Sequence, residues 1–250
     1  MKAERQDSIV ELLKTHEIMT VSDLSQRFET SVMTIRRDLD YLDSIGVVKK
    51  VHGGAVLLKS EQPSFNERII SGLDIKQKIG QKAAEFINEG SVVFFDAGTT
   101  PLCVVEAIPE KLEFTAITTG LMTGVSLCSK PRVNVVVVGG SIHHTSYSAM
   151  DYNSANQIKE FRADLAFIST SAIAPGTGTY EVVLPLIEVK RAIVSVSKKV
   201  VLLADHTKFS SQALRLSIPI SDIHVVITDS QIPEKHLEDL KRAVKEVYVV

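Results

Sequence analysis

The chain has 250 residues, of which 44% are hydrophobic and 23% are charged; this composition excludes a disordered or fibrous protein and allows a buried core. Its 28 basic and 30 acidic residues give a formal net charge of -2. The chain as a whole therefore does not attract nucleic acid or an anionic membrane, and any such partner must bind to a local basic patch. No apolar run approaches the ~18 residues of a membrane span, and the N-terminal segment lacks the apolar centre of a signal peptide. Cys103 and Cys128 are too few for a disulfide framework or a metal cluster, so a reducing cytoplasm is the expected location.

The N-terminal part carries the periodicity of three short helices. The first begins near Ala3. Thr20, followed three residues later by Asp23, is a capping-box pattern that predicts a second helix. Ser31 is placed to cap a third helix that ends at Gly46. The expected buried stripes are Ile9, Leu12, Leu13 and His16 in the first helix and Val32, Ile35, Leu39 and Leu42 in the third.

A hairpin is expected after the third helix. The apolar runs 47–52 and 55–58 flank Gly53-Gly54, and a two-residue glycine turn between such runs is a hairpin signal. Three helices followed by a hairpin form a winged helix-turn-helix. Residues 1–58 are therefore predicted to be a DNA-binding domain.

The third predicted helix has a polar face opposite its apolar stripe. If Ile35 is buried, Arg36 and Arg37 point outward, and a guanidinium can bind guanine in the major groove or a phosphate. The alternative is a solvated face with helix salt bridges, since residues 1–60 hold nine basic and nine acidic residues. The predicted DNA-binding residues are Ser31, Met33, Thr34, Arg36, Arg37, Lys49, Lys50, His52, Gly53 and Gly54.

The rest of the chain alternates between strand and helix patterns. Residues 59–73 are predicted to be a linker, because the stretch 59–68 is polar and contains Pro63, which suits an exposed connection. Asp74 is expected to cap a helix that stops at Gly90. The alternation predicts an α/β domain over residues 74–250, with a largely parallel sheet and helices on both faces. Strands are expected at 91–95, 114–118, 133–138, 165–169, 200–204, 225–228 and 244–250, and helices at 122–128, 151–161, 186–195 and 233–243.

Small, donor-rich loops follow several of these strands. Because ligands bind beyond the carboxyl ends of parallel strands, the loops predict an anion-binding rim suited to a phosphate or carboxylate. Each loop taken alone is an ordinary turn between strand and helix. The predicted effector-binding residues are Asp96, Gly98, Thr99, Thr100, Thr119, Gly120, Gly139, Gly140 and Lys208, and no cofactor is expected.

The motifs of both parts resemble those of the DeoR family of bacterial transcriptional regulators of sugar metabolism. They are residues 30–39 with 51–55, the loop 96–100, Gly139-Gly140, Lys208 and residues 227–229. The resemblance implies a winged helix-turn-helix joined to a sensor domain of the ribose-5-phosphate isomerase and CoA-transferase-like folds. It also implies a repressor of a carbohydrate-utilisation operon, as a homodimer or homotetramer, whose operator affinity responds to a phosphorylated sugar or related metabolite.

Three departures from the family pattern lie near the expected effector pocket. Gly120 stands where asparagine is usual, Asp151 lies near a common glycine, and Ser169 and Ala172 replace small residues that are usually glycine. An added carboxylate at Asp151 is expected to disfavour a dianionic ligand unless it faces a sugar hydroxyl. The family resemblance therefore predicts DNA binding more directly than it predicts the identity of the effector.

An enzyme is the alternative interpretation of the second part. A sugar-phosphate isomerase needs a general base and a group that polarises the carbonyl, and Asp96, Asp205 and Lys208 have suitable chemistry. Against it, an isomerase has no use for an attached DNA-binding module, and both carboxylates can equally fix loop backbone. His143, His144 and His206 lack a spaced carboxylate or cysteine partner, so no metal site is predicted.

Overall fold

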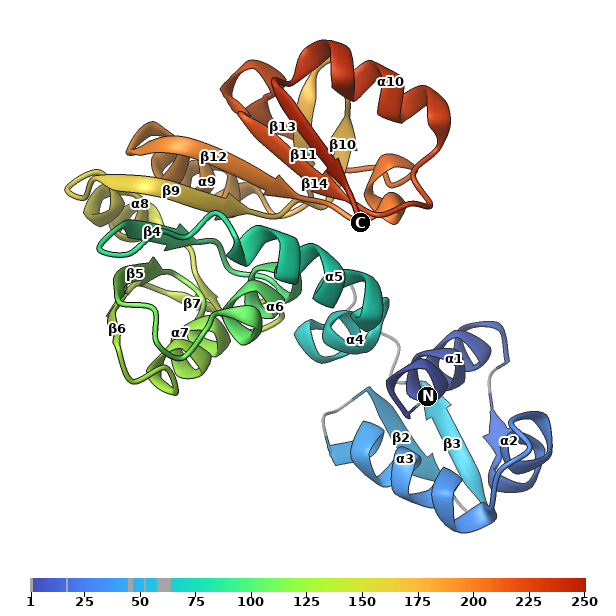
Figure 1. Cartoon of the computed structure of the whole chain (residues 1–250). Coiled ribbons are helices and arrows are strands. Elements are labelled where there is room, and N and C mark those ends of the chain that lie inside the picture. Colours follow the sequence, from blue (N-terminus) through green and yellow to red (C-terminus); the bar gives the residue numbers. More distant parts are fainter. Residues whose placement is uncertain (1, 17, 45–46, 52, 58–63) are drawn as a thin grey trace. The chain divides into compact units, whose positions relative to one another are not determined.

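The structure is a computed structural model that describes all residues except 1, 17, 45–46, 52 and 58–63 (Figure 1). The chain divides into two compact units, one up to Asp74 and one from Ile75 to Val250. In the described part of the chain, no helix has the length and apolar character needed to cross a membrane. The predictions for Gly46, His52 and Leu58 lie outside the described residues.

The first unit contains the three predicted helices and the hairpin. Its sheet is antiparallel, in the order β1-β3-β2, and the short strand β1 was not predicted. Figure 1 shows α3 beside the hairpin formed by β2 and β3. The elements are α1 (Lys2–Thr15), β1 (Met19–Thr20), α2 (Val21–Arg27), α3 (Val32–Ser44), β2 (Val48–Val51) and β3 (Gly54–Leu57).

The predicted caps and most of the predicted core are confirmed. Asp23 N–H donates to the Thr20 hydroxyl oxygen (3.1 Å) at the start of α2, and Thr34 N–H donates to that of Ser31 (3.2 Å) at the start of α3. Leu12 is only partly buried, and two other stripe residues are exposed. Val32, the first residue of α3, is 44% exposed. His16 follows the end of α1, where its Nδ1 lies 3.0 Å from the Leu12 carbonyl oxygen. The fully buried residues of this core include Ile9, Leu24, Ile35, Leu39 and Leu42.

The hairpin register differs from the prediction by one residue. Val51 pairs with Gly54, so Gly54 belongs to β3 and not to the turn. Only Gly53 has the left-handed backbone, with φ +78°. Gly54 instead pairs with Thr20 of β1, and a Cβ built on it would collide with the Met19 carbonyl oxygen. Gly54 is therefore required by the close approach of two strands, and not by the turn.

The predicted linker is wrong for residues 65–70, which form helix α4 (Phe65–Ile70). Ser64 and Glu67 make a reciprocal capping box that the sequence analysis overlooked. Phe65 and Ile70 are 2% and 4% exposed, and Ile70 joins the core of the first unit. This segment therefore buries apolar surface.

The second unit is built on a parallel sheet, as predicted. Within the described residues the sheet has seven strands in the order β15-β14-β12-β9-β4-β5-β6, and every neighbouring pair is parallel. Its carboxyl ends thus share one edge. The strands are β4 (Val92–Phe95), β5 (Phe114–Thr118), β6 (Val133–Val137), β9 (Ala163–Ile168), β12 (Ser197–Leu203), β14 (Val225–Thr228) and β15 (Glu246–Val249).

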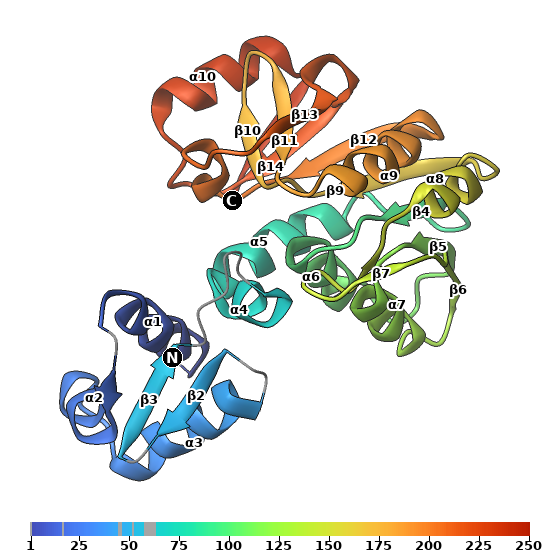
Figure 2. The ribbon, with the colours of Figure 1, turned by 180° about the vertical axis from the view of Figure 1, so that it is seen from behind.

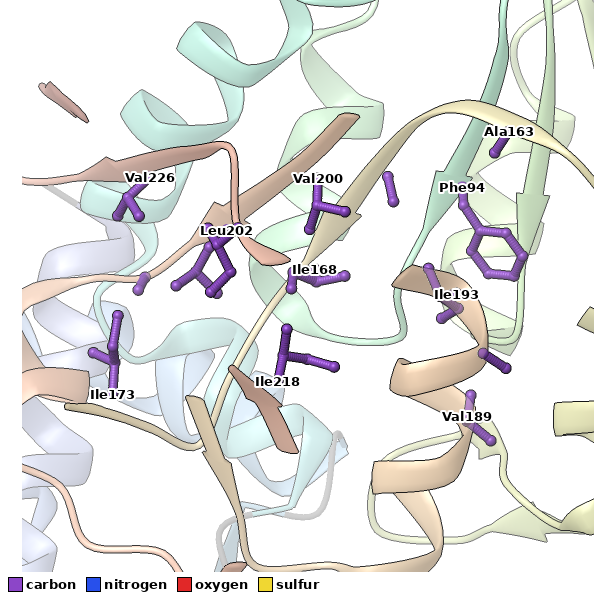
Figure 3. Close-up of a cluster of buried hydrophobic side chains, with 14 of the residues drawn as sticks. Phe94, Ala163, Ile168, Ile173, Val189, Ile193, Val200, Leu202, Ile218 and Val226 are labelled. Carbon is purple, nitrogen blue, oxygen red and sulfur yellow. The ribbon is translucent and has the colours of Figure 1, made fainter. Parts of the chain in front are cut away.

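Helices cover both faces of this sheet and bury a separate core on each (Figures 1 and 2). Phe94 packs with Val189 and Ile193 of α9 on one face (Figure 3), whereas Phe95 packs with Ile79 and Val104 on the other. The helices are α5 (Leu73–Ala84), α6 (Thr99–Ala107), α7 (Leu121–Cys128), α8 (Tyr152–Ile158), α9 (Leu184–Ser195) and α10 (Glu234–Ala243).

Some elements of the second unit differ from the prediction. Asp74 lies in the first turn of α5 rather than capping it, and α5 ends at Ala84, well before Gly90. A hairpin, β7 (Ile142–His143) and β8 (Ser148–Ala149), and an antiparallel sheet, β10-β11-β13, were not predicted. The other elements are β10 (Ala172–Ala174), β11 (Gly178–Glu181), β13 (Arg215–Pro219) and the 3-10 helices η1 (His206–Phe209) and η2 (Ile220–Asp222).

Candidate functional sites

The outer face of α3 is exposed, as expected for a helix that reads DNA. Arg36 and Arg37 are exposed, and Met33 is 58% exposed. Ser31 and Thr34 lie at the helix start, where their hydroxyl oxygens are 2.9 Å apart. Neither arginine forms an ion pair with any described residue. The two guanidiniums are therefore available to an external anion.

The opposite side of α3 is fixed by a carboxylate that the sequence analysis did not single out. Asp38 is 1% exposed, and its two oxygens accept hydrogen bonds from Arg5 Nε (2.6 Å) and Gln6 Nε2 (2.9 Å) of α1. Breaking a buried pair leaves a charge without compensation, so this pair ties the orientation of α3 to α1. The presentation of both arginines depends on that orientation.

The hairpin, here called the wing, adds two exposed lysines to the same unit. Lys50 Nζ forms an ion pair with Asp40 of α3, and Lys50 N–H donates to Asp43 Oδ1 (3.0 Å). A phosphate must therefore compete with Asp40 for the Lys50 ammonium, whereas Lys49 forms no ion pair with a described residue.

A hollow of about 360 Å³ lies between α3 and the wing. Arg36 and Lys50 contribute charge to its wall, and Val32, exposed at the start of α3, contributes apolar surface. The structure thus brings four of the predicted DNA-binding residues, Arg36, Lys50, Gly53 and Gly54, to one concave surface, whereas Arg37 and Lys49 are not among its lining residues. The lining residues are Val21, Ser22, Val32, Arg36, Leu39, Lys50, Val51, Gly53 and Gly54.

Arg37→Ala is expected to weaken operator binding by ~1–3 kcal/mol if the guanidinium contacts a base, because a good base contact has that value. Discrimination at the contacted base pair should then fall. A phosphate contact instead predicts equal weakening on all sequences and a salt dependence reduced by about one ion. Gel shifts at several salt concentrations measure both. Arg242→Ala, on exposed α10, is the matched control, and unchanged binding by Arg37→Ala would remove this residue from the interface.

In the second unit, the predicted effector residues follow strands along the carboxyl edge of the sheet. The loops after the neighbouring strands β4 and β5 are in direct contact. A Cβ built on Gly120 would lie 3.2 Å from Ala97 Cα and 3.0 Å from Thr123 Oγ1. Glycine at position 120, where asparagine was expected, therefore lets these loops approach closely. Asp96, Gly98, Thr99, Thr100, Thr119 and Gly120 belong to this pair of loops.

Asp96 is completely buried and is held by the loop after β9. Its Oδ2 accepts hydrogen bonds from Ser169 N–H (3.0 Å) and the Ser169 hydroxyl (2.9 Å). A Cβ on Gly98 would lie 2.9 Å from the same hydroxyl oxygen. Ser169, a departure from the usual glycine, therefore orients the carboxylate that begins the loop.

A buried lysine completes this arrangement, and the sequence analysis missed it. Lys190 Nζ lies 3.1 Å from Asp96 Oδ2 and 2.6 Å from Glu181 Oε1, and the three side chains are at most 3% exposed. Ser171 donates to Glu181 Oε2 (2.6 Å). Burial alone lowers the pKa of Lys190, but the two carboxylates outweigh it and raise the pKa above its ordinary value. The available signal was a glutamate and a lysine nine residues apart in an apolar stretch.

Three buried polar atoms at these loops have no hydrogen-bond partner among the described residues. They are Asp96 Oδ1, Thr119 Oγ1 and Thr123 Oγ1. Buried polar groups are normally paired, so unpaired ones indicate a ligand or water. An ionised carboxylate only accepts hydrogen bonds, whereas a threonine hydroxyl also donates. Together they suit a ligand that carries both hydroxyl and anionic oxygens.

The double glycine after β6 is exposed and is fixed by Asp151. Oxygens of Asp151 accept hydrogen bonds from Ser154 N–H (2.7 Å) and Ser141 N–H (2.8 Å), and these bonds hold the pKa of that carboxyl well below its usual range. A Cβ on Gly140 would collide with Ser154 Oγ. Asp151 therefore caps α8 and clamps the Gly139-Gly140 loop.

Lys208 lies on η1, which follows β12, and its side chain is partly buried. The side chain forms no ion pair with a described residue. Neighbouring strands lie ~4.8 Å apart, so β12 and β4 are ~10 Å apart and β12 and β6 ~19 Å apart. Lys208 and Gly139-Gly140 can therefore contact the same ligand only if the loops after β12 and β6 extend toward each other across the ~19 Å between these strands.

Both units match known families. The family model described as the DeoR-like helix-turn-helix domain matches residues 5–61, and that of the DeoR C terminal sensor domain matches residues 72–230. The regulator GolR of Listeria innocua is 35% identical over 92% of this chain and 91% of its own. The glycerol-3-phosphate regulon repressor of Escherichia coli is 30% identical over 93% and 92%.

Among solved structures, ribose 5-phosphate isomerase A of Neisseria gonorrhoeae is 18% identical, with a TM-score of 0.40 over 55% of this chain and 53% of its own. The sensor family model alone covers more than half of this chain, and the relatives align over nearly all of it. The chain therefore belongs to the DeoR family of DNA-binding transcriptional regulators.

Proposed function

We propose that this regulator represses a carbohydrate-utilisation operon and that a phosphorylated sugar or related metabolite modulates its operator affinity. The unit up to Asp74 would bind the operator and the unit from Ile75 would bind the effector. The observation that carries the proposal is the presence of both DeoR domains in one chain. Relatives named as repressors of the glycerol-3-phosphate regulon and the aga operon support it. The expected assembly is a homodimer or homotetramer in the cytoplasm, where its operator lies.

The chemistry of the loops after β4 and β5 supports an oxygen-rich anionic effector. Thr99 and Thr100 form the first turn of α6, which has no side-chain cap within the described residues, and the N–H groups of a first turn favour an anion through the helix dipole. Asp96 Oδ1 is left to accept a hydrogen bond from a hydroxyl group. A sugar phosphate has both groups, whereas inorganic phosphate lacks the carbon-bound hydroxyls.

The isomerase alternative is less well supported because its candidate bases already have structural partners. Asp96 Oδ2 is occupied by Lys190 and Ser169, and Asp205 Oδ1 accepts from both the N–H and the hydroxyl of Thr207. Burial raises the pKa of the Cys103 thiol to about 12, so this cysteine is not an activated nucleophile. The contacts of Asp96 and Asp205 fix the conformation of their loops. This is the structural role that the sequence analysis gave as the alternative to catalysis.

A thermal-shift screen of pentose, hexose and triose phosphates tests the proposal. A ligand at ~100 times its dissociation constant should stabilise the second unit by ~2.7 kcal/mol. The best ligand should then change operator affinity in a gel shift, by a coupling of ~1–3 kcal/mol. Saturable isomerisation lost in Asp205→Asn would favour the enzyme instead.

Lys208→Ala is expected to weaken the response to that ligand while leaving operator binding unchanged, because its ammonium pairs with no carboxylate of the described residues and can pair with the anion. Titration of the ligand against a preformed complex of protein and DNA gives the midpoints of variant and wild type. Lys235→Ala, exposed on α10, is the matched control. Equal midpoints would exclude Lys208 from the site, and loss of the DNA complex without ligand would give it a structural role.

A further inference from the structure

Helix α7 and the edge strand β6 of the second unit are neighbours (Figure 1), and both expose apolar side chains. On α7, Leu121 and Met122 are each 39% exposed and Val125 is 69% exposed. On β6, Val137 is 45% exposed. A Cβ on Gly124 of α7 would lie 2.9 Å from Val137 Cγ2, so helix and strand are in contact here. Leu121, Met122, Val125 and Val137 are called the α7–β6 face below.

The strand in this face is an unprotected sheet edge. β6 pairs on one side only, with β5, and in regular register. Its sequence from Val133 to Val137 contains neither a charged residue nor a proline. Exposed edges in monomers are usually protected by lysine, proline or a bulge. The absence of all three along β6 is expected for a strand that another chain covers.

The surroundings of the face are nearly free of charge. Residues 114–150 include no acidic residue, and their basic residues are Lys130 and Arg132, although 23% of the whole chain is charged. Lys130 Nζ donates to the Ile108 carbonyl oxygen (2.8 Å), at the end of α6. Depletion of charge marks the centre of protein interfaces. A face without net charge also does not repel an identical face.

A standard dimer interface uses ~20–30 residues on each side, so the four residues of the face would form only its centre. The stretch 121–144, which contains them, has twenty residues that are at least partly exposed and can extend the contact. A two-fold axis places the same patch of both subunits in contact, so an apolar, uncharged face is complementary to itself. Two-fold symmetry also matches the paired half-sites of helix-turn-helix operators.

We propose that two copies of this chain form a two-fold dimer through the α7–β6 face. The inference rests on the oligomer proposed above and adds the location of its interface. Val125 is the most exposed member of the face and would be buried in the dimer. The second copy would also cover the free edge of β6.

Val125→Glu tests the interface in the full chain. Light scattering should give the wild type at least twice the 27.4 kDa mass of one chain. In Val125→Glu, two carboxylates brought together should weaken the dimer at least tenfold. Tyr152→Glu is the matched control, since Tyr152 is 78% exposed on α8, which packs on the other face of the sheet. An equimolar mixture of Val125→Glu and Val125→Lys should restore the wild-type mass.

The possible outcomes distinguish a wrong interface from a wrong oligomeric state. A monomeric wild type would overturn the oligomer and its interface together. Wild-type mass for Val125→Glu would overturn the α7–β6 face alone and leave the oligomer standing. Circular dichroism must match that of the wild type; if Val125→Glu does not fold, Met122→Lys is measured in its place, and unchanged mass in that variant is equally decisive against the face.

Discussion

Lys190→Met is expected to destabilise the second unit by about 3–5 kcal/mol, because it leaves two buried carboxylates without their cation. Methionine keeps the length of the side chain, so the loss of charge is the main change. Asp96 and Glu181, 0% and 3% exposed at their side chains, then have no compensating charge. Denaturant unfolding of the full chain should show an earlier transition for the second unit and an unchanged one for the first. Effector binding should weaken as well, since Asp96 begins the loop that leads into α6.

Lys198→Met is the matched control for this prediction. Lys198 also pairs with a carboxylate, Asp164 (2.8 Å), but it is 79% exposed, and exposed pairs contribute ~0–1 kcal/mol. Equal stability of Lys190→Met and the wild type would show that the buried charges are compensated by other means.

The pH dependence of this stabilisation follows from the raised pKa of Lys190. Its contribution is fully present below the pKa of an unfolded lysine, ~10.4, and is lost only as pH rises through the higher folded value. The contribution of the charged Lys190 to wild-type stability should therefore be constant through the neutral range.

The fold was predictable where local pattern and tertiary contacts agree. The apolar runs at residues 114–118 and 225–228 gave strands β5 and β14 at their true bounds, because a buried parallel strand is apolar on both faces. The sheet β10-β11-β13 was missed because its short strands are set by mutual pairing. Helix α4 was overlooked because its flanking residues are polar, although the capping box at Ser64 was visible in the sequence.

For the candidate sites, the sequence indicated loops but not the contacts among them. The donor-rich loops at residues 96–100 and 119–120 were visible because each directly follows a strand. The partnership of Asp96 with Lys190 was not, because 94 residues separate them and a lysine in a helical pattern is usually exposed. Likewise, Asp38 reads as part of the polar Arg-Arg-Asp stretch, but the packing of α3 on α1 buries it.

Gly54→Val is expected to abolish operator binding by displacing β1 from the wing. A Cβ at this position would collide with the Met19 carbonyl oxygen and lie 3.1 Å from Thr20 Cα. These are backbone atoms of the neighbouring strand and cannot rotate away, so the cost should reach or exceed the ~3 kcal/mol upper end of ordinary overpacking. The second unit should keep its unfolding transition. Gel shifts and denaturant unfolding of the full chain measure both effects.

Gly53→Ala separates this explanation from strain in the turn itself. Gly53 has φ +78° and no atom within 4 Å of a built Cβ, so alanine there costs only the left-handed backbone, ~1–2 kcal/mol. If close packing on β1 is the cause, Gly54→Ala, which adds a single methyl group, should already bind operator more weakly than Gly53→Ala. The reverse order would mean that the turn, and not the pairing of β1 with β3, limits the wing.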